Sequence, residues 1–276
     1  MSEILSYESV YDFKTFSKEN LATDKYYFFM RLYDAQYKGN NICTPLSKVI
    51  KGVDVNVNDP VTSYNHAACS YKLTDDFFGL TTNTKGEEFS VNTECCEKTE
   101  NNRYMSSTDI TKSKFSIYAV PISKEEWEKT RNFLELELRD PKIKYSTFSL
   151  IKFITDNLGY KMAKNKFERA SEDAEDLNEE EMIGNKEHLV CSTFVAYTLS
   201  RNTTYKDIFD RYGVNYNLVS PNDLANKIPG ATYCCSGLFK DYNKTIRAFI
   251  NKNKQFEKFY TPFLSEVKTG CLPKRK

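Results

Sequence analysis

Histidine is almost absent from this chain of 276 residues, which contains only His66 and His188. Any site that needs an imidazole therefore has two candidates at most. Eight cysteines are present, but the adjacent pairs Cys95-Cys96 and Cys234-Cys235 lack the Cys-x-x-Cys spacing of zinc and dithiol redox sites. We therefore expect neither a metal site nor a cofactor.

An excess of charge of one sign and a long apolar run are also missing. Lys and Arg total 39 and Asp and Glu total 38, so the net charge of +1 gives no reason to expect a nucleic-acid partner. No apolar run approaches the roughly 20 residues that span a bilayer, so we expect no integral membrane segment. The chain also starts without a signal-peptide pattern, which favours a cytoplasmic or virion-associated protein with reduced thiols.

One cysteine opens an apolar run with the character of a helix, Cys191-Ser-Thr-Phe-Val-Ala-Tyr-Thr-Leu199. A helix amino terminus carries a partial positive charge and unpaired backbone N–H groups, which stabilise a thiolate and lower the thiol pKa. Cys191 is therefore the candidate nucleophile. The competing interpretation is a small buried hydrophobic side chain, the usual state of a cysteine on an apolar helix.

A nucleophilic cysteine needs a base, and His66 lies in an alternating segment, 61–73, that predicts a strand. His66, Ala68 and Ser70 share one face of this strand. Ala68 and Ser70 are small, so we expect the Cys191 helix to pack on that face beside His66. His188, three residues before Cys191, is the less favoured base, and either histidine could instead be structural.

The other elements follow from strand alternation, helical spacing and capping residues. Ser123 and Glu126 have capping-box spacing, and Ser220 precedes a second helix start. Strands are predicted at 26–33, 77–82 and 114–122, helices at 44–50, 124–139 and 147–158, and a helical tail at 237–260.

Two segments are too polar for a core. Residues 83–110 are predicted to be a surface excursion with at most one short strand. The acidic insertion 167–187 contains eight carboxylates between 167 and 182, which repel one another and keep the segment in water. An acidic docking surface, or a lid over Cys191, is the functional alternative for this insertion.

Several separated motifs occur in a familiar order: Tyr26 to Tyr33, Thr44-Pro-Leu-Ser-Lys-Val-Ile50, Tyr64-Asn-His-Ala-Ala68, the Cys191 run and Pro221-Asn-Asp-Leu224. This order resembles the circularly permuted papain-like amidases and peptidases of the NlpC superfamily. The resemblance implies an α+β fold in which an antiparallel sheet packs against the helix that begins at the catalytic cysteine. It covers residues 26–230, which leaves 1–25 as an amino-terminal extension and 231–276 as a carboxyl-terminal helical extension.

The resemblance also implies roles for Cys191 and His66. Cys191 would attack the carbonyl of an amide or ester, in a peptidoglycan peptide, a protein or a lipid-type substrate, while His66 takes its proton. The backbone N–H of Cys191 would hold the oxyanion. The third polar residue of such sites stays unassigned among Thr81, Thr82 and Asn83. The alternative is an inactive papain-like scaffold that binds other virion or bacterial proteins, as a phage virion component would.

Overall fold

The computed structural model describes residues 26–39, 64–73, 76–79, 92–95, 108–135, 144–145, 188–205, 219–226, 228 and 230–260. Several sequence predictions fall outside these residues. They are the amino-terminal extension, the helices at 44–50 and 147–158, the acidic insertion 167–187, and the three candidates for the third catalytic residue.

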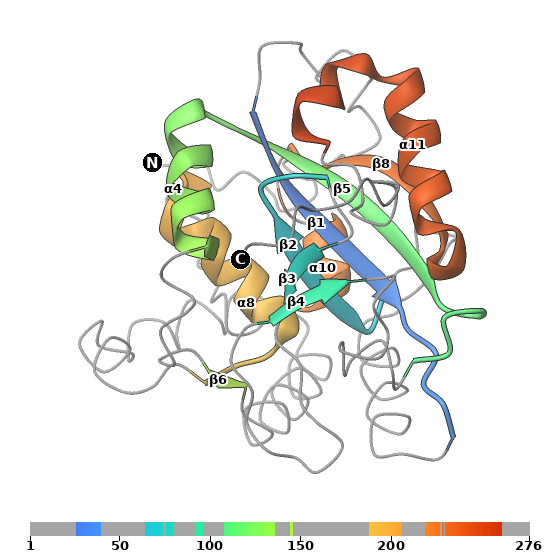
Figure 1. Cartoon of the computed structure of the whole chain (residues 1–276). Coiled ribbons are helices and arrows are strands. Elements are labelled where there is room, and N and C mark those ends of the chain that lie inside the picture. The colour runs from blue at the N-terminus through green and yellow to red at the C-terminus, as the bar shows by residue number, and fades with distance from the viewer. Residues whose placement is uncertain are drawn as a thin grey trace, which may run out of the picture.

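A six-stranded sheet forms the centre of the molecule, and every pair of neighbouring strands in it is antiparallel. The strand order is β4-β3-β2-β1-β5-β8 (Figure 1). The strands are β1 (Tyr26–Asp34), β2 (His66–Ser70), β3 (Asp76–Gly79), β4 (Asn92–Cys95), β5 (Lys114–Ile122) and β8 (Thr232–Leu238). Together with the helices, this sheet confirms the α+β class.

One face of the sheet, which we call the α8 face, is covered by α8 (Cys191–Asn202), α4 (Lys124–Glu135) and α10 (Pro221–Asn226). Alternate residues of the central strand β1 point to this face: Phe28, Met30 and Leu32. They pack in one buried cluster with Phe194 of α8. The α8 helix therefore rests on the middle of the sheet.

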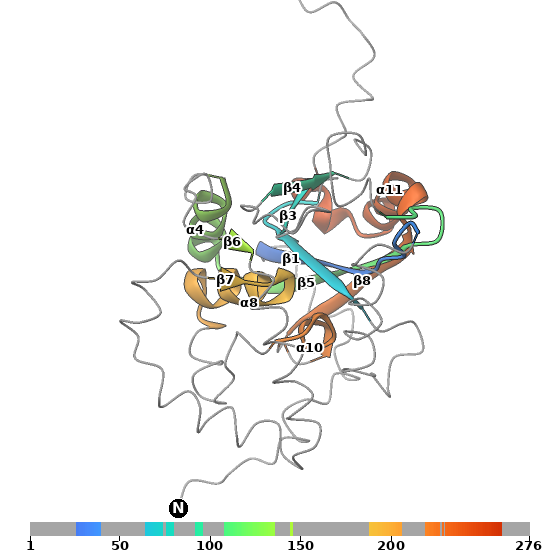
Figure 2. The same cartoon turned by 90° about the horizontal axis from the view of Figure 1, so that it is seen from below.

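The opposite face, which we call the α11 face, is covered by α11 (Tyr242–Lys252) and two short 3₁₀ helices, η5 (Phe239–Asp241) and η6 (Lys254–Phe259). Figure 2 shows α8 and α11 on opposite sides of the sheet. The intervening residues of β1 point here and pack with Phe256, whose ring centroid lies 5.0 Å from that of Tyr27 and 6.1 Å from that of Phe29. The sheet is thus buried on both sides.

The strand predicted from alternation at 114–122 and the helix predicted from the Ser123 cap both form at the expected places. The strand at 114–122 is β5, and Ser123 caps α4: its hydroxyl accepts the Glu126 N–H at 3.2 Å, while Glu126 accepts the Ser123 N–H at 2.6 Å. Glu126 also accepts the Thr204 N–H at 2.6 Å, which links α4 to the end of α8. Burial alone would raise the pKa of Glu126, but these N–H donors outweigh it and the pKa lies below its ordinary value.

The carboxyl-terminal part corrects the predicted domain boundary at 230. Residues 232–238 are not part of a helical extension, because they form β8 and pair with β5. The predicted helical tail from 237 begins only with η5 and α11, and α11 covers the sheet.

The described part of the polar excursion 83–110 includes the edge strand β4. A separate two-stranded parallel pair joins β6 (Lys144–Tyr145) to β7 (His188–Leu189).

Gly237 allows α11 to lie close to β8. A Cβ built on Gly237 would lie 2.7 Å from Oγ1 and 3.4 Å from Cγ2 of Thr245. We expect Gly237→Ala to lower the free energy of unfolding in urea by about 1–3 kcal/mol, the usual effect of overpacking. Adding Thr245→Ala removes both contacted atoms and should restore most of the loss. Additive effects of the two substitutions would contradict this explanation.

Candidate active site

Cys191 occupies the first position of α8, as its sequence predicts. The N-cap is Val190, whose apolar side chain cannot accept hydrogen bonds from the first N–H groups of the helix. Thr193 closes the first turn instead, since its hydroxyl accepts the Val190 N–H at 2.8 Å and donates to the Val190 carbonyl at 3.1 Å. Cys191 is 7 % exposed, so the thiol is at a helix amino terminus but is largely buried.

His66 is the first residue of β2 and is 5 % exposed. It stands opposite Tyr33 of β1, and the two rings stack with centroids 5.3 Å apart and planes inclined by 20°. Tyr33 in turn packs on Phe239, at 4.7 Å between ring centroids. His66 is therefore part of the aromatic packing on the α11 face.

The two predicted catalytic residues thus lie on elements that pack together, but on different sides of the sheet. His66 shares the α11 face with Tyr33, whereas α8 packs on the opposite face, which carries Ala67 and Cys69 of β2. The prediction that the Cys191 helix packs on the small-residue face of His66 is therefore wrong. That Cys191 and His66 act as a pair stays a prediction.

This packing prediction fails because the side chain of Arg31 fills the space beside the small residues of β2. Ala68 stands opposite Arg31 of β1, and the Arg31 guanidinium lies 4.5 Å from the Phe77 ring centroid and 5.1 Å from that of Tyr33. Small residues beside His66 therefore make room for a buried arginine and its aromatic rings. The sequence pattern indicated free space correctly, but it did not identify what fills that space.

The second candidate base, His188, begins β7 and pairs through its backbone with Lys144 of β6. Its side chain lies outside the described part of the structure, as do Thr81, Thr82 and Asn83.

Further polar side chains lie on the α8 face. The Tyr64 hydroxyl donates to Ser116 at 2.9 Å and lies 3.5 Å from the Tyr118 hydroxyl. The Tyr64 backbone N–H donates to the side chain of Asn222 at 2.9 Å, which attaches α10 to the start of β2. Tyr64 and Asn222 each lie in one of the separated motifs of the sequence, but no local pattern predicts that they contact each other.

Ser192, the next residue of α8, is 1 % exposed, and its hydroxyl has no hydrogen-bond partner among the described residues. A buried hydroxyl without a partner is unfavourable by about 1–3 kcal/mol. The buried start of α8 therefore contains, next to Cys191, a polar side chain that the described residues leave unsatisfied.

The described ranges contain no group of three or more His, Cys, Asp or Glu residues that could hold a metal ion. Within the same ranges no helix is long and apolar enough to cross a bilayer.

The sequence matches no protein-family model, and no significant match is found among curated proteins or among solved structures. The fold and site geometry therefore carry the functional argument on their own.

Proposed function

We propose that the chain is a structural or interaction protein built on a circularly permuted papain-like core that has little or no hydrolase activity. Its partners would be other proteins, virion or bacterial proteins among them. The observation that carries this proposal is the position of His66, which stacks on Tyr33 on the α11 face while the Cys191 helix covers the α8 face. A general base must be within hydrogen-bond reach of the thiol that it activates, directly or through one water.

The burial of Cys191 supports the same proposal. A thiol at a helix amino terminus is activated when it is partly exposed and has cationic neighbours. Cys191 is only 7 % exposed and begins a helix in which every residue from Cys191 to Leu199 is buried. Under this proposal the cysteine contributes to packing between α8 and the sheet, in the manner of a small apolar residue.

The test is the pH dependence of Cys191 alkylation, followed by peptide mass spectrometry in the unmodified chain and in His66→Phe. Phenylalanine keeps a ring against Tyr33 and removes the base, so it is a better matched variant than alanine. We expect slow labelling of Cys191 in both proteins, with less than about a twofold difference in rate between them. Cys69, which is fully buried, provides an internal reference for labelling limited by opening of the core.

Rapid Cys191 labelling that persists below pH 7 and disappears in His66→Phe would overturn the proposal. That result would establish an activated pair and would favour the second candidate function, a thiol-dependent hydrolase or acyltransferase acting on an amide or ester. The observation in favour of this second candidate is the position of Cys191 as the first residue of a 12-residue helix that packs against the strand begun by His66. In that case the backbone N–H groups at the helix start would stabilise the thiolate and the oxyanion.

A further inference from the structure

The pairing of β8 with β5 contains an irregularity at the two adjacent cysteines. Ile117 stands opposite Cys235 and Tyr118 stands opposite Tyr233, so Cys234 is an extra residue without a partner in the ladder. This is the geometry of a β-bulge, in which two residues of one strand face one residue of the other. Strict alternation of side chains therefore fails at this point.

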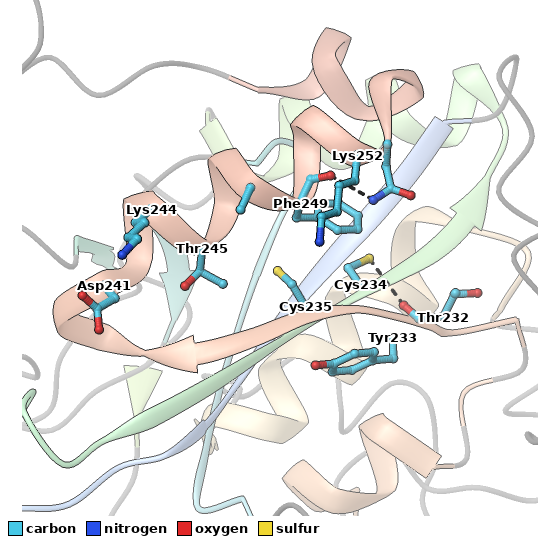
Figure 3. A pocket seen from close by; sticks show the side chains of 11 residues that line it. Thr232, Tyr233, Cys234, Cys235, Asp241, Lys244, Thr245, Phe249 and Lys252 are labelled. Atoms are coloured by element: carbon cyan, nitrogen blue, oxygen red, sulfur yellow. Dashed lines mark hydrogen bonds between the residues drawn. The ribbon is translucent and has the colours of Figure 1, made fainter.

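As a result, both thiols project to the same side of the sheet. Tyr233 points to the α8 face, with its ring 5.8 Å from that of Tyr118, whereas Cys234 and Cys235 both pack against the cluster of the α11 face. Figure 3 shows the two sulfur atoms on the side of β8 that faces α11, with Tyr233 on the other side. In a regular strand, adjacent cysteines would lie on opposite faces and could not act together.

The two thiols border a pocket of about 680 Å³ between β8 and α11. Both cysteines are free, and Cys234 donates a weak hydrogen bond from its sulfur to the Thr232 carbonyl at 3.5 Å. Phe249 and Lys252 line the pocket from α11, and Figure 3 shows the Lys252 side chain extending over it. The pocket thus combines two soft sulfur ligands, an apolar wall and a cation.

We propose that Cys234 and Cys235 form a two-thiolate site for a soft monovalent metal ion, with Cu(I) as the representative ion. Thiolate sulfur is the ligand type that selects Cu(I). In binding, two S–H bonds break, two protons pass to solvent and two Cu–S bonds form, which leaves the metal unit with one negative charge. The ammonium group of Lys252 is placed to balance that charge.

A zinc site does not fit the same residues. Structural zinc needs four ligands in tetrahedral geometry, and the described residues contain no cluster of three or more His, Cys, Asp or Glu. The pair therefore suits an ion that accepts two sulfur ligands.

Burial raises the pKa of the Cys235 thiol to about 12, and burial together with the neighbouring Cys235 raises the pKa of Cys234 well above its ordinary value. The other titratable or charged groups that line the pocket are Tyr233 from β8, Asp241 from η5, and Lys244 and Lys252 from α11.

The experiment is an anaerobic titration of the full chain with Cu(I), in competition with a chromogenic Cu(I) chelator. Cys95→Ser and Cys96→Ser form the background, because they remove the other adjacent pair. We expect one tightly bound ion, and at least about a hundredfold loss of affinity in either Cys234→Ser or Cys235→Ser, since the second thiolate acts as an intramolecular ligand.

Two controls keep the result interpretable. Cys271→Ser removes a single thiol elsewhere and should leave the affinity unchanged. Cys234→Ser keeps a hydroxyl donor for the Thr232 carbonyl, and its urea unfolding curve checks that the fold persists. Affinity that survives both single substitutions overturns the site. This result does not bear on Cys191, so this test and the test of the proposed function fail independently.

Discussion

Replacing Phe194 by alanine is expected to lower the free energy of unfolding by about 3–5 kcal/mol, the range observed when a buried phenylalanine is truncated. Phe194 lies in the first turn of α8, is fully buried and packs with residues of β1 and β2 on the α8 face. Its backbone N–H also donates to the Val190 carbonyl at 2.9 Å, so the ring lies where the helix begins. Truncation would leave a cavity between the helix start and the sheet.

The measurement is urea unfolding of the wild type, Phe194→Ala and Phe194→Leu. Leucine keeps much of the apolar volume and should reduce stability by less than about 1.5 kcal/mol. Cys191 lies three residues earlier on the same side of the helix, so its alkylation should also become faster in Phe194→Ala than in Phe194→Leu. If the alanine variant loses less than about 1 kcal/mol, the ring is not a principal contact between α8 and the sheet.

Replacing Arg31 by alanine is expected to reduce stability by at least about 3 kcal/mol, because the substitution leaves a cavity and removes cation–π contacts. Arg31 is fully buried in the centre of β1. Its guanidinium lies 4.5 Å from the Phe77 ring centroid and 5.1 Å from those of Tyr33 and Tyr242, and its Nε donates to the Tyr33 hydroxyl. The side chain therefore joins β1, β3 and α11.

Arg31→Met tests whether the volume or the charge of the arginine side chain stabilises the fold. Methionine fills irregular apolar space, and buried charged groups replaced by apolar side chains of similar volume often retain stability. We expect Arg31→Met to lose about half as much stability as Arg31→Ala, as measured by urea midpoint at constant slope. Equal losses for methionine and alanine would mean that the charge, and not the filled volume, carries the effect.

The features that could be predicted from the sequence are those set by neighbours within a few residues. The Ser123–Glu126 cap, the start of α8 at Cys191 and the boundaries of β5 each depend on hydrogen bonds or alternation inside one short segment. The helix start at Ser220 belongs to the same group, since Ser220 and Asp223 bond each other at 2.8–3.1 Å. Such signals depend little on the rest of the fold.

The candidate site was predicted only in part. Alternation correctly placed His66 and Ala68 on one face of β2, and helical spacing placed Cys191 at a helix start. Which face of β2 meets α8 depends on the pairing of β2 with β1, and that pairing puts Arg31 beside Ala68. A period of two residues defines two faces of a strand, but only the neighbouring strands and helices decide what covers each face.

The carboxyl-terminal strand β8 likewise depends on long-range strand pairing, which the local sequence does not encode. Residues 232–238 fall in the predicted carboxyl-terminal helical extension, yet they pair with β5, whose residues lie more than a hundred positions earlier in the chain. The bulge at Cys234 arises in that pairing, and it alone brings two adjacent thiols to one face. The starting points of the short elements could be predicted from the sequence, because local hydrogen bonds and periodicity encode them, while the α+β class was implied by the order of the separated motifs. Which faces meet is set by the tertiary structure, because long-range strand pairing and the shapes of distant side chains decide that outcome.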